Sequence, residues 1–319
     1  MSANAPVSRS PLLIWGALAI VYVVWGSTYL GIRIAIETLP PLLHGATRFV
    51  TASLLLAGFL LIKKGTAAFT MTPRQFGGAA LVGLLLLTGG NGMVAVAEQH
   101  ISSGLAALLV ASVPLWLVVF RIIARDRPAL LTVAGVLVGF GGVAALSLNG
   151  GGEEAGTTGI VVILLASLSW SIGSFISSRI PMPPNVWTAS AVEMLAGGAG
   201  LAIVSTSIGE HVDLAAVSGR SWAALAYLVL VGSLVGFTAY TWLLGNAPIS
   251  LVSTYAYVNP AVAVVLGVLV VNEHVTAQIV LGGVVILIGV ALVVSTERRA
   301  KRTPAPAQAG EVDTAPQQA

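Results

Sequence analysis

The sequence predicts an all-α membrane protein whose ten transmembrane helices form two inverted five-helix repeats, with the N and C termini in the cytoplasm. Three observations carry this prediction: a very apolar composition, ten apolar stretches of spanning length, and similar landmarks in the two halves of the chain. Of the 319 residues, 56% are hydrophobic and 8% are charged, and the mean hydropathy is +0.95. So few charged side chains cannot cover a water-exposed surface, and most of this chain must therefore face lipid.

The composition also excludes several kinds of chemistry. Cysteine is absent, which excludes disulfides, thiolate metal sites and cysteine nucleophiles. The net charge is only +3, and the basic residues stand in short connecting segments, which argues against nucleic-acid binding. The first apolar stretch, 12–36, is far longer than the apolar core of about 7 to 15 residues in a cleavable signal peptide, so we expect it to stay in the membrane.

Apolar stretches bounded by charged residues, prolines or glycine clusters define the expected helices. Their approximate bounds are 12–36, 42–62, 76–97, 102–123, 129–148, 159–180, 185–208, 221–244, 250–271 and 276–296. After the tenth helix, four basic residues precede a run of proline, alanine and glutamine. This composition predicts a disordered cytoplasmic tail over 297–319.

The distribution of charge predicts the direction of each crossing. With the N-terminus in the cytoplasm, 12 of the 15 basic residues lie on the cytoplasmic side: Arg9, Lys63, Lys64, Arg74, Arg121, Arg125, Arg127, Arg179, Arg298, Arg299, Lys301 and Arg302. The external segments hold the acids Glu37, Glu153, Glu154, Glu210 and Asp213. The positive-inside rule therefore predicts a multi-pass protein of a cytoplasmic (inner) membrane, with cytoplasmic termini and an even number of crossings.

Landmarks recur in the two halves of the chain at an offset of about 143 to 148 residues. Trp25 aligns with Trp170, Pro40-Pro41 with Pro183-Pro184, Val113-Pro114 with Asn259-Pro260, and Asp126 with Glu273. Their common order indicates duplication, with a first repeat over 1–150 and a second over 151–296. Because each repeat has an odd number of helices, the second is inverted in the membrane. This arrangement is typical of secondary transporters, whose sites lie between the halves near the midplane.

Pro114 and Pro260 are expected near the middle of their helices. Each removes an amide donor and frees the carbonyl four residues earlier, which in lipid needs a protein or water partner. Their matching positions favour hinges beside a cavity. Packed kinks are the alternative, because proline is common in membrane helices.

Arg48 and Glu193 are charged residues expected well inside the membrane, at a cost of about 2.5 to 3.5 kcal/mol each. They occupy equivalent positions but differ by about 9 Å in expected depth, so an ion pair would require their helices to touch. Asn91 and Glu98 are nearer to Arg48 in depth. We expect Arg48 to face a cavity; snorkelling or structural hydrogen bonding is the alternative for both charges.

Glu98 and Glu193 are also the acids placed in or beside the membrane on core helices, and burial raises a carboxyl pKa towards neutrality. If transport is coupled to protons, these two are the expected proton carriers. Glu98 is expected to meet external protons directly at the outer end of the third helix, and water should reach Glu193 only in an inward-open state. Pairing with Arg48 or helix capping is the alternative.

Polar and aromatic side chains within the helices supply further candidates for lining a cavity. They are Trp25, Thr28, Trp170, Tyr240, Tyr257 and Asn259. The alternative is that the hydroxyl groups join helices and the aromatic rings anchor the chain at the membrane interface. Gly135, Gly139 and Gly289 are spaced for close helix contact, either between the two halves or between two protomers of a homodimer.

The chain resembles the EamA type of the drug/metabolite transporter superfamily from about 12 to 296. The residues that carry the resemblance are Val24-Trp25-Gly26, Arg48, Asn91-Gly92-Met93, Glu98, Ser103-Gly104-Leu105-Ala106-Ala107, Val113-Pro114, Asn259-Pro260 and Glu273. The stretch from Gly90 to Trp116 resembles the YedA-like exporter branch in particular. The resemblance implies a ten-helix fold and a secondary transporter that exports amino acids, other small metabolites or amphipathic drugs by alternating access. Asp126 departs from the glutamate usual in the family but keeps an acid.

Other classes of function fit the residues less well. No Gly-x-x-x-x-Gly-Lys-Ser/Thr motif is present, which argues against an ATP-driven pump. His44, His100, His211 and His274 lack metal-site spacing, so no metal or cofactor is expected, and none is placed to activate Ser103 in a membrane-embedded enzyme. His44, His100 and His274 are expected to be solvated near helix ends. A channel or uncoupled facilitator stays open as an alternative. The expected partners are a small-molecule substrate and membrane lipid.

Overall fold

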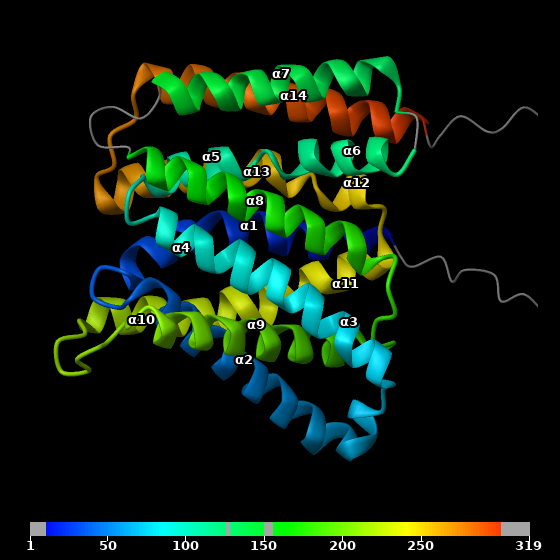
Figure 1. Ribbon diagram of the computed structural model, residues 1–319, viewed down its shortest axis with the longest axis vertical. Helices are drawn as coiled ribbons and strands as arrows, with labels where there is room; N and C mark the ends of the chain where they lie inside the picture. Colours follow the sequence, from blue (N-terminus) through cyan, green and yellow to red (C-terminus); the bar gives the residue numbers. More distant parts are fainter. Residues whose placement is uncertain (1–10, 126–127, 150–155, 301–319) are drawn as a thin grey trace, which may run out of the picture.

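The computed structural model describes residues 11–125, 128–149 and 156–300, and every regular element within them is helical (Figure 1). The first half contains α1 (Pro11–Ala35), α2 (Pro41–Lys64), η1 (Gly65–Phe69), α3 (Pro73–Gly83), η2 (Leu84–Gly92), α4 (Met93–Ala97), α5 (Ser103–Val110), α6 (Val113–Ile123) and α7 (Leu130–Asn149). The second half contains α8 (Thr157–Ser177), α9 (Val186–Ser207), α10 (Gly219–Tyr227), η3 (Leu228–Phe237), α11 (Thr238–Asn246), α12 (Ile249–Val252), α13 (Tyr255–Val271) and α14 (Ala277–Ala300).

Within this described part, eight helical stretches of 20 to 29 residues are long and apolar enough to cross a membrane. Two shorter apolar helices cover Leu130–Ala145 and Val258–Val271. All of them run roughly along one direction, horizontal in Figure 1, and α1 begins on the side where α14 ends. The expected bounds agree with the observed ones to within a few residues. The largest difference is at the end of α14, which continues to Ala300 instead of ending at 296.

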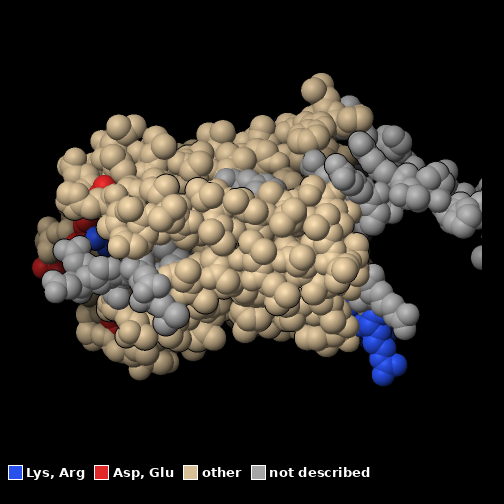
Figure 2. Space-filling model, turned by 90° about the horizontal axis from the view of Figure 1, so that it is seen from above, with Lys and Arg blue, Asp and Glu red and all other residues tan. Residues whose placement is uncertain are grey.

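Charged side chains gather at the two ends of the bundle. The face seen in Figure 2 is almost wholly uncharged between these ends. Lys63 and Lys64 end α2 on the side where α1 begins. Glu37 and Arg220 form a partly exposed ion pair of 3.6 Å at the opposite end. An uncharged belt between two charged ends is the surface expected of a protein that spans a bilayer.

The helices α7 and α14 pack backbone to backbone at one edge of the bundle (top of Figure 1). A Cβ atom on Gly289 would lie 2.4 Å from the Cα atom of Gly139, and one on Gly142 would lie 2.8 Å from the backbone nitrogen of Ile286. Glycine is needed here because any side chain would push the two helices apart. Since α7 and α14 belong to different halves, these glycines join the two halves within one chain.

The third helix of each half contains a π-helix. The segments η2 and η3 begin 144 residues apart, at Leu84 and Leu228, and both are flanked by α-helix. In a π-helix each amide bonds to the carbonyl five residues earlier, so the backbone is wider; such segments are rare and are often found at functional sites. The hydropathy pattern did not predict them.

The fourth helix of each half is interrupted. The first breaks at Ala111 and Ser112, between α5 and α6. Pro114 is therefore the second residue of α6, in a first turn where a missing amide costs no helical hydrogen bond, and not at the middle of a helix as expected. Pro260 lies inside α13, as expected.

Candidate functional site

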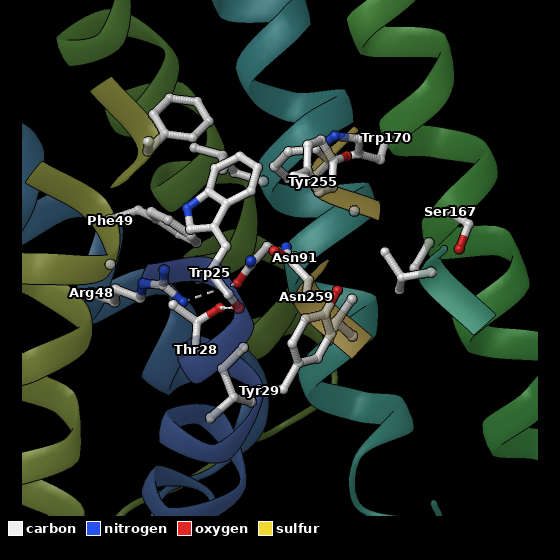
Figure 3. Close-up of a pocket in the computed structure, with 18 residues that line it drawn as sticks. Trp25, Thr28, Tyr29, Arg48, Phe49, Asn91, Ser167, Trp170, Tyr255 and Asn259 are labelled. Atoms are coloured by element: carbon white, nitrogen blue, oxygen red, sulfur yellow. Dashed lines mark hydrogen bonds between the residues drawn. The ribbon is translucent and has the colours of Figure 1, made fainter. Parts of the chain in front are cut away.

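A small cavity lies at the centre of the bundle (Figure 3). Its walls come from α1, α2, η2, α4 and α5 of the first half, and from α8, η3 and α13 of the second. The cavity measures about 50 Å³. This volume is well below the about 300 to 1,000 Å³ typical of pockets that hold organic ligands. The structure therefore shows a contracted form of the cavity, which must widen before it can accept an organic molecule.

Arg48 is the charged group in the wall of this cavity. Its side chain is 2% exposed. The Nε atom donates a hydrogen bond to Ser233 Oγ at 2.9 Å. Nη1 donates a second one to Asn91 Oδ1 at 3.3 Å, on the side of the cavity that Figure 3 shows. Both partners are neutral. Among the described residues no carboxylate lies within ion-pair distance of Arg48, so its buried charge has no counter-ion there.

The equivalence of Arg48 and Glu193 does not produce an ion pair. Glu193 is 2% exposed and accepts a hydrogen bond of 3.1 Å from Thr241 Oγ1 of α11. The two charges are thus satisfied separately, each by hydroxyl or amide groups. Of the two nearer candidates by depth, Asn91 contacts Arg48 and Glu98 does not.

Four aromatic rings pack together at the cavity: Trp25, Trp170 and Tyr255 line it, whereas Tyr240, which was also expected to line it, contacts these rings without being part of the lining. Trp25 and Trp170 meet edge to face with ring centroids 5.3 Å apart, and Tyr240 lies 4.7 Å from Trp25 and 5.5 Å from Trp170. Tyr255 completes the group at 5.5 Å from Trp25. The hydroxyl of Tyr240 is held by Trp170 Nε1 at 3.2 Å and by Ser174 Oγ at 2.7 Å. Interlocked in this way, the rings form a rigid apolar wall beside Arg48.

Each tryptophan of this group lies on a glycine of the opposite half. A Cβ atom on Gly90 of η2 would lie 2.8 Å from Cε3 of Trp170, and one on Gly236 of η3 would lie 2.8 Å from Nε1 of Trp25. The two contacts are equivalent under the internal duplication, because Gly90 and Gly236 are 146 residues apart and the tryptophans 145. Each π-helix therefore positions the tryptophan ring that comes from the other half.

The other expected cavity residues are found as follows. Thr28, Asn91 and Asn259 line the cavity. Thr28 Oγ1 bonds to the Trp25 carbonyl at 2.7 Å, and the Asn259 amide lies 3.1 Å from the carbonyl of Tyr22. The side chain of Tyr257 is outside the part that the structure describes, and so is the whole of Asp126.

Glu98 differs from its expected setting. It follows α4 at the end of the third span, yet its side chain is 0% exposed, so it does not meet solvent in this state, contrary to expectation. Within the described part, neither carboxyl oxygen has a hydrogen-bond partner. Arg33 donates instead to the backbone carbonyl of Glu98. Burial, followed by the nearby Glu273, raises the pKa of Glu98 well above its ordinary value, against the opposing effect of Arg33.

His44 also differs from expectation, because it is 1% exposed and not solvated, whereas His100 and His274 are exposed. The sequence reasoning did not single out Phe49, Tyr255 or Ser233 as site residues, although all three border the cavity or hold Arg48.

Comparison with known proteins agrees with this architecture. The model of the EamA-like transporter family matches residues 13–148 and again residues 157–295. The chain belongs to the EamA-like transporter family. The inner membrane transporter YedA of Escherichia coli (strain K12) is 43% identical over 263 residues, which cover 81% of this chain and 83% of that protein. The transporter YvbV of Bacillus subtilis (strain 168) is 22% identical over 94% of this chain and 96% of that protein.

The fold of this EamA-like transporter is also found in a solved structure, described only as "Crystal structure of protein". It superposes with a TM-score of 0.64 and 19% sequence identity, covering 90% of this chain and 98% of that one. At this identity the likeness concerns the fold alone. The family assignment made from sequence is confirmed, and so is the location: the chain is a multi-pass transporter of the inner membrane.

Proposed function

We propose that this EamA-like transporter is a secondary carrier that exports a small carboxylate-bearing molecule, such as an amino acid or an amphipathic drug, by alternating access. Arg48 is the observation that carries the proposal. It is a buried cation in a cavity between the two halves, and its described partners are the neutral side chains of Asn91 and Ser233. An uncompensated charge inside a membrane protein marks a substrate path, and a guanidinium group binds a carboxylate with two parallel hydrogen bonds. The outward direction follows from the exporter branch that the chain resembles.

The aromatic wall beside Arg48 suits the rest of such a substrate. Trp25, Trp170 and Tyr255 offer apolar faces for a hydrocarbon or ring portion, and their electron-rich faces also attract an ammonium group. Thr28 and Asn259 add hydrogen-bonding groups. A cation at one side and aromatic rings at the other form a site for a molecule with a carboxylate head and an apolar body.

For the membrane arrangement we propose ten crossings in two inverted repeats, 1–150 and 151–296, with both termini in the cytoplasm. The matching π-helices and the reciprocal contacts of Trp25 and Trp170 support the duplication. The start of α1 and the end of α14 on one side support the even number of crossings.

Alternating access requires contacts at the outer face that break and reform. Two carboxylates of the second half bind backbone amides at helix starts in the first half. Glu273 Oε1 accepts from Ser103 N at 2.8 Å, and Glu210 Oε2 accepts from Leu43 N at 2.8 Å. We propose that these contacts close the outer side in the present state. The breaks in the fourth helix of each half, at Ala111–Ser112 near Pro114 and at Ser253–Thr254 near Pro260, then supply the hinges.

For coupling, we propose that Glu98 or Glu193 carries the proton. Both are buried. Glu98, with neither oxygen paired within the described part, is suited to being neutral in the closed state and to releasing its proton when the outer side opens. The role stays with these two residues because no other acid within the described part is buried.

The main alternative function is a channel or uncoupled facilitator. A membrane enzyme is a weaker alternative. A cavity contracted to about 50 Å³ supports a carrier over an open pore. Purified protein in proteoliposomes, screened against amino acids, amines and dyes with and without a pH gradient, tests the proposal. We expect saturable flux for carboxylate-bearing compounds. Flux that rises linearly with concentration and ignores the gradient would favour the channel.

A further inference from the structure

A second and larger cavity lies on the membrane-facing side of the bundle, away from the central site. It measures about 690 Å³ and lies between α1, α2, α11 and the start of α9. Apart from Thr238, its lining is apolar and includes Ile20, Leu55, Phe59, Trp187 and Trp242. These residues belong to membrane-spanning stretches, so hydrocarbon chains and not water surround the groove.

The groove has one charged end. It is bounded by the start of α1, the end of α2 and the start of α9, which share one side of the bundle. Lys63 follows Phe59 by four residues, so it lies on the same face of α2 about 6 Å farther along, and Lys64 is its neighbour. Both lysines are exposed. An apolar groove that ends at two cations has the two features of a site for an anionic lipid.

We propose that this groove binds one acyl chain of an anionic phospholipid, whose headgroup contacts Lys63 and Lys64. Trp187 is 47% exposed beside the groove and has the amphipathic ring that prefers the headgroup level. The assignment of this lipid to the cytoplasmic leaflet rests on the proposed topology, but the binding itself does not.

A lipid at this position would contact a helix that also borders the central cavity. The π-helix η3 is a wall of both cavities: Leu234 and Val235 line the groove, and Gly232 and Phe237 line the central cavity. Gly236 of the same segment also contacts Trp25. An acyl chain in the groove therefore packs against the outer face of the segment that positions the aromatic wall.

Native mass spectrometry of the full chain in detergent, titrated with phosphatidylglycerol or phosphatidylcholine of the same acyl chains, tests the proposal. Gly16 lines the groove and a Cβ atom there meets no atom within 4 Å, so Gly16→Phe places a ring at the groove. Gly141→Phe, where a Cβ atom likewise meets no atom, is the matched control on α7. We expect saturable, preferential retention of phosphatidylglycerol. Gly16→Phe should weaken it about tenfold, since displacing about two methylene groups is enough for that loss, whereas Gly141→Phe should leave it unchanged.

A second pair of variants tests the headgroup separately. Lys63→Gln with Lys64→Gln should remove the preference for phosphatidylglycerol and leave the weaker retention of phosphatidylcholine as it was. Ala239 of α11 also lines the groove, so Ala239→Leu narrows it from another wall. This variant replaces Gly16→Phe if that protein does not fold. Equal retention of both lipids by the wild type, or unchanged retention in both groove variants, overturns the proposal. So does a dimer signal that Gly16→Phe abolishes, because a second copy of the chain would then cover the groove.

Discussion

Trp25 of α1 and Trp170 of α8 stand in equivalent positions of the two halves and meet edge to face, with their ring centroids 5.3 Å apart. Each indole ring also lies against a glycine in the π-helix of the other half. The duplication therefore brings two copies of one contact together at the centre of the molecule. A shift of either π-helix must therefore move the indole ring that lies against it.

Gly90→Ala and Gly236→Ala are expected to have similar effects. Each new methyl group would stand 2.8 Å from an indole ring, which must shift, and overpacking of this kind costs about 1 to 3 kcal/mol. We expect both variants to melt at a lower temperature in detergent and to transport more slowly. Gly58→Ala, whose Cβ meets no atom within 4 Å, is the control and should behave as the wild type or melt slightly higher. If only one of the two variants is affected, the contacts are not equivalent.

The stability of the protein should depend on pH through Glu98. Its pKa is raised by burial and by Glu273, with Arg33 and Tyr29 the other ionisable groups that face it. The folded protein thus binds this proton more tightly than the unfolded chain does. The stabilisation is complete below the unfolded pKa of about 4.3 and is lost as pH rises through the folded value. Glu98→Gln should flatten the rise of melting temperature on acidification, and Glu37→Gln, at an exposed acid, should not.

Transport measurements separate the proton role from the structural one. Glu98→Gln or Glu193→Gln, each neutral and nearly isosteric, should abolish flux driven by a pH gradient while sparing substrate exchange at equal pH. Both reactions are followed in the same proteoliposomes. Wild-type dependence on the gradient in both variants would show that protons travel by another path or that the carrier is uncoupled.

The proposed topology predicts which positions react from outside. The chain has no cysteine, so single cysteines report without background. Lys63→Cys and Asp126→Cys should resist a membrane-impermeant maleimide in intact cells and react after lysis. Gly151→Cys and Gly219→Cys should react at once. Labelling of position 63 from outside would show that the chain is inserted in the opposite orientation.

The bounds of the helices could be predicted from the sequence because the hydropathy pattern that marks them is strong and local. Long apolar stretches ended by prolines, glycines and charges predicted the observed bounds to within a few residues, and the tryptophan offset predicted that Trp25 and Trp170 border one cavity. The two π-helices in the wall of the cavity were not predictable, because the hydropathy of a segment is the same whether its backbone forms an α-helix or a π-helix. The break before Pro114 was missed for a similar reason: a proline predicts a disturbance, and packing decides where the helix restarts.

Burial of individual polar groups was the least predictable feature. Glu98 and His44 stand near helix ends, where solvation is the usual outcome, yet neighbouring helices cover both. Depth along a helix follows from residue number, but cover by another helix depends on contacts between distant parts of the chain. Likewise, Ser233 became a partner of Arg48 across 185 residues, a relationship that no local pattern contains.

The central claim is that Arg48 binds a substrate carboxylate, and paired transport measurements test it most directly. Once the substrate screen has found a carboxylate-bearing compound, its kcat/KM is measured beside that of its neutral amide, in wild type and in Arg48→Gln. Loss of a paired charge-assisted contact costs about 1.5 to 3 kcal/mol, or roughly 10- to 150-fold. We predict that the wild type prefers the carboxylate by about that factor and that folded Arg48→Gln transports both compounds alike. An Arg48→Gln protein that keeps the wild-type preference for the carboxylate would contradict the account.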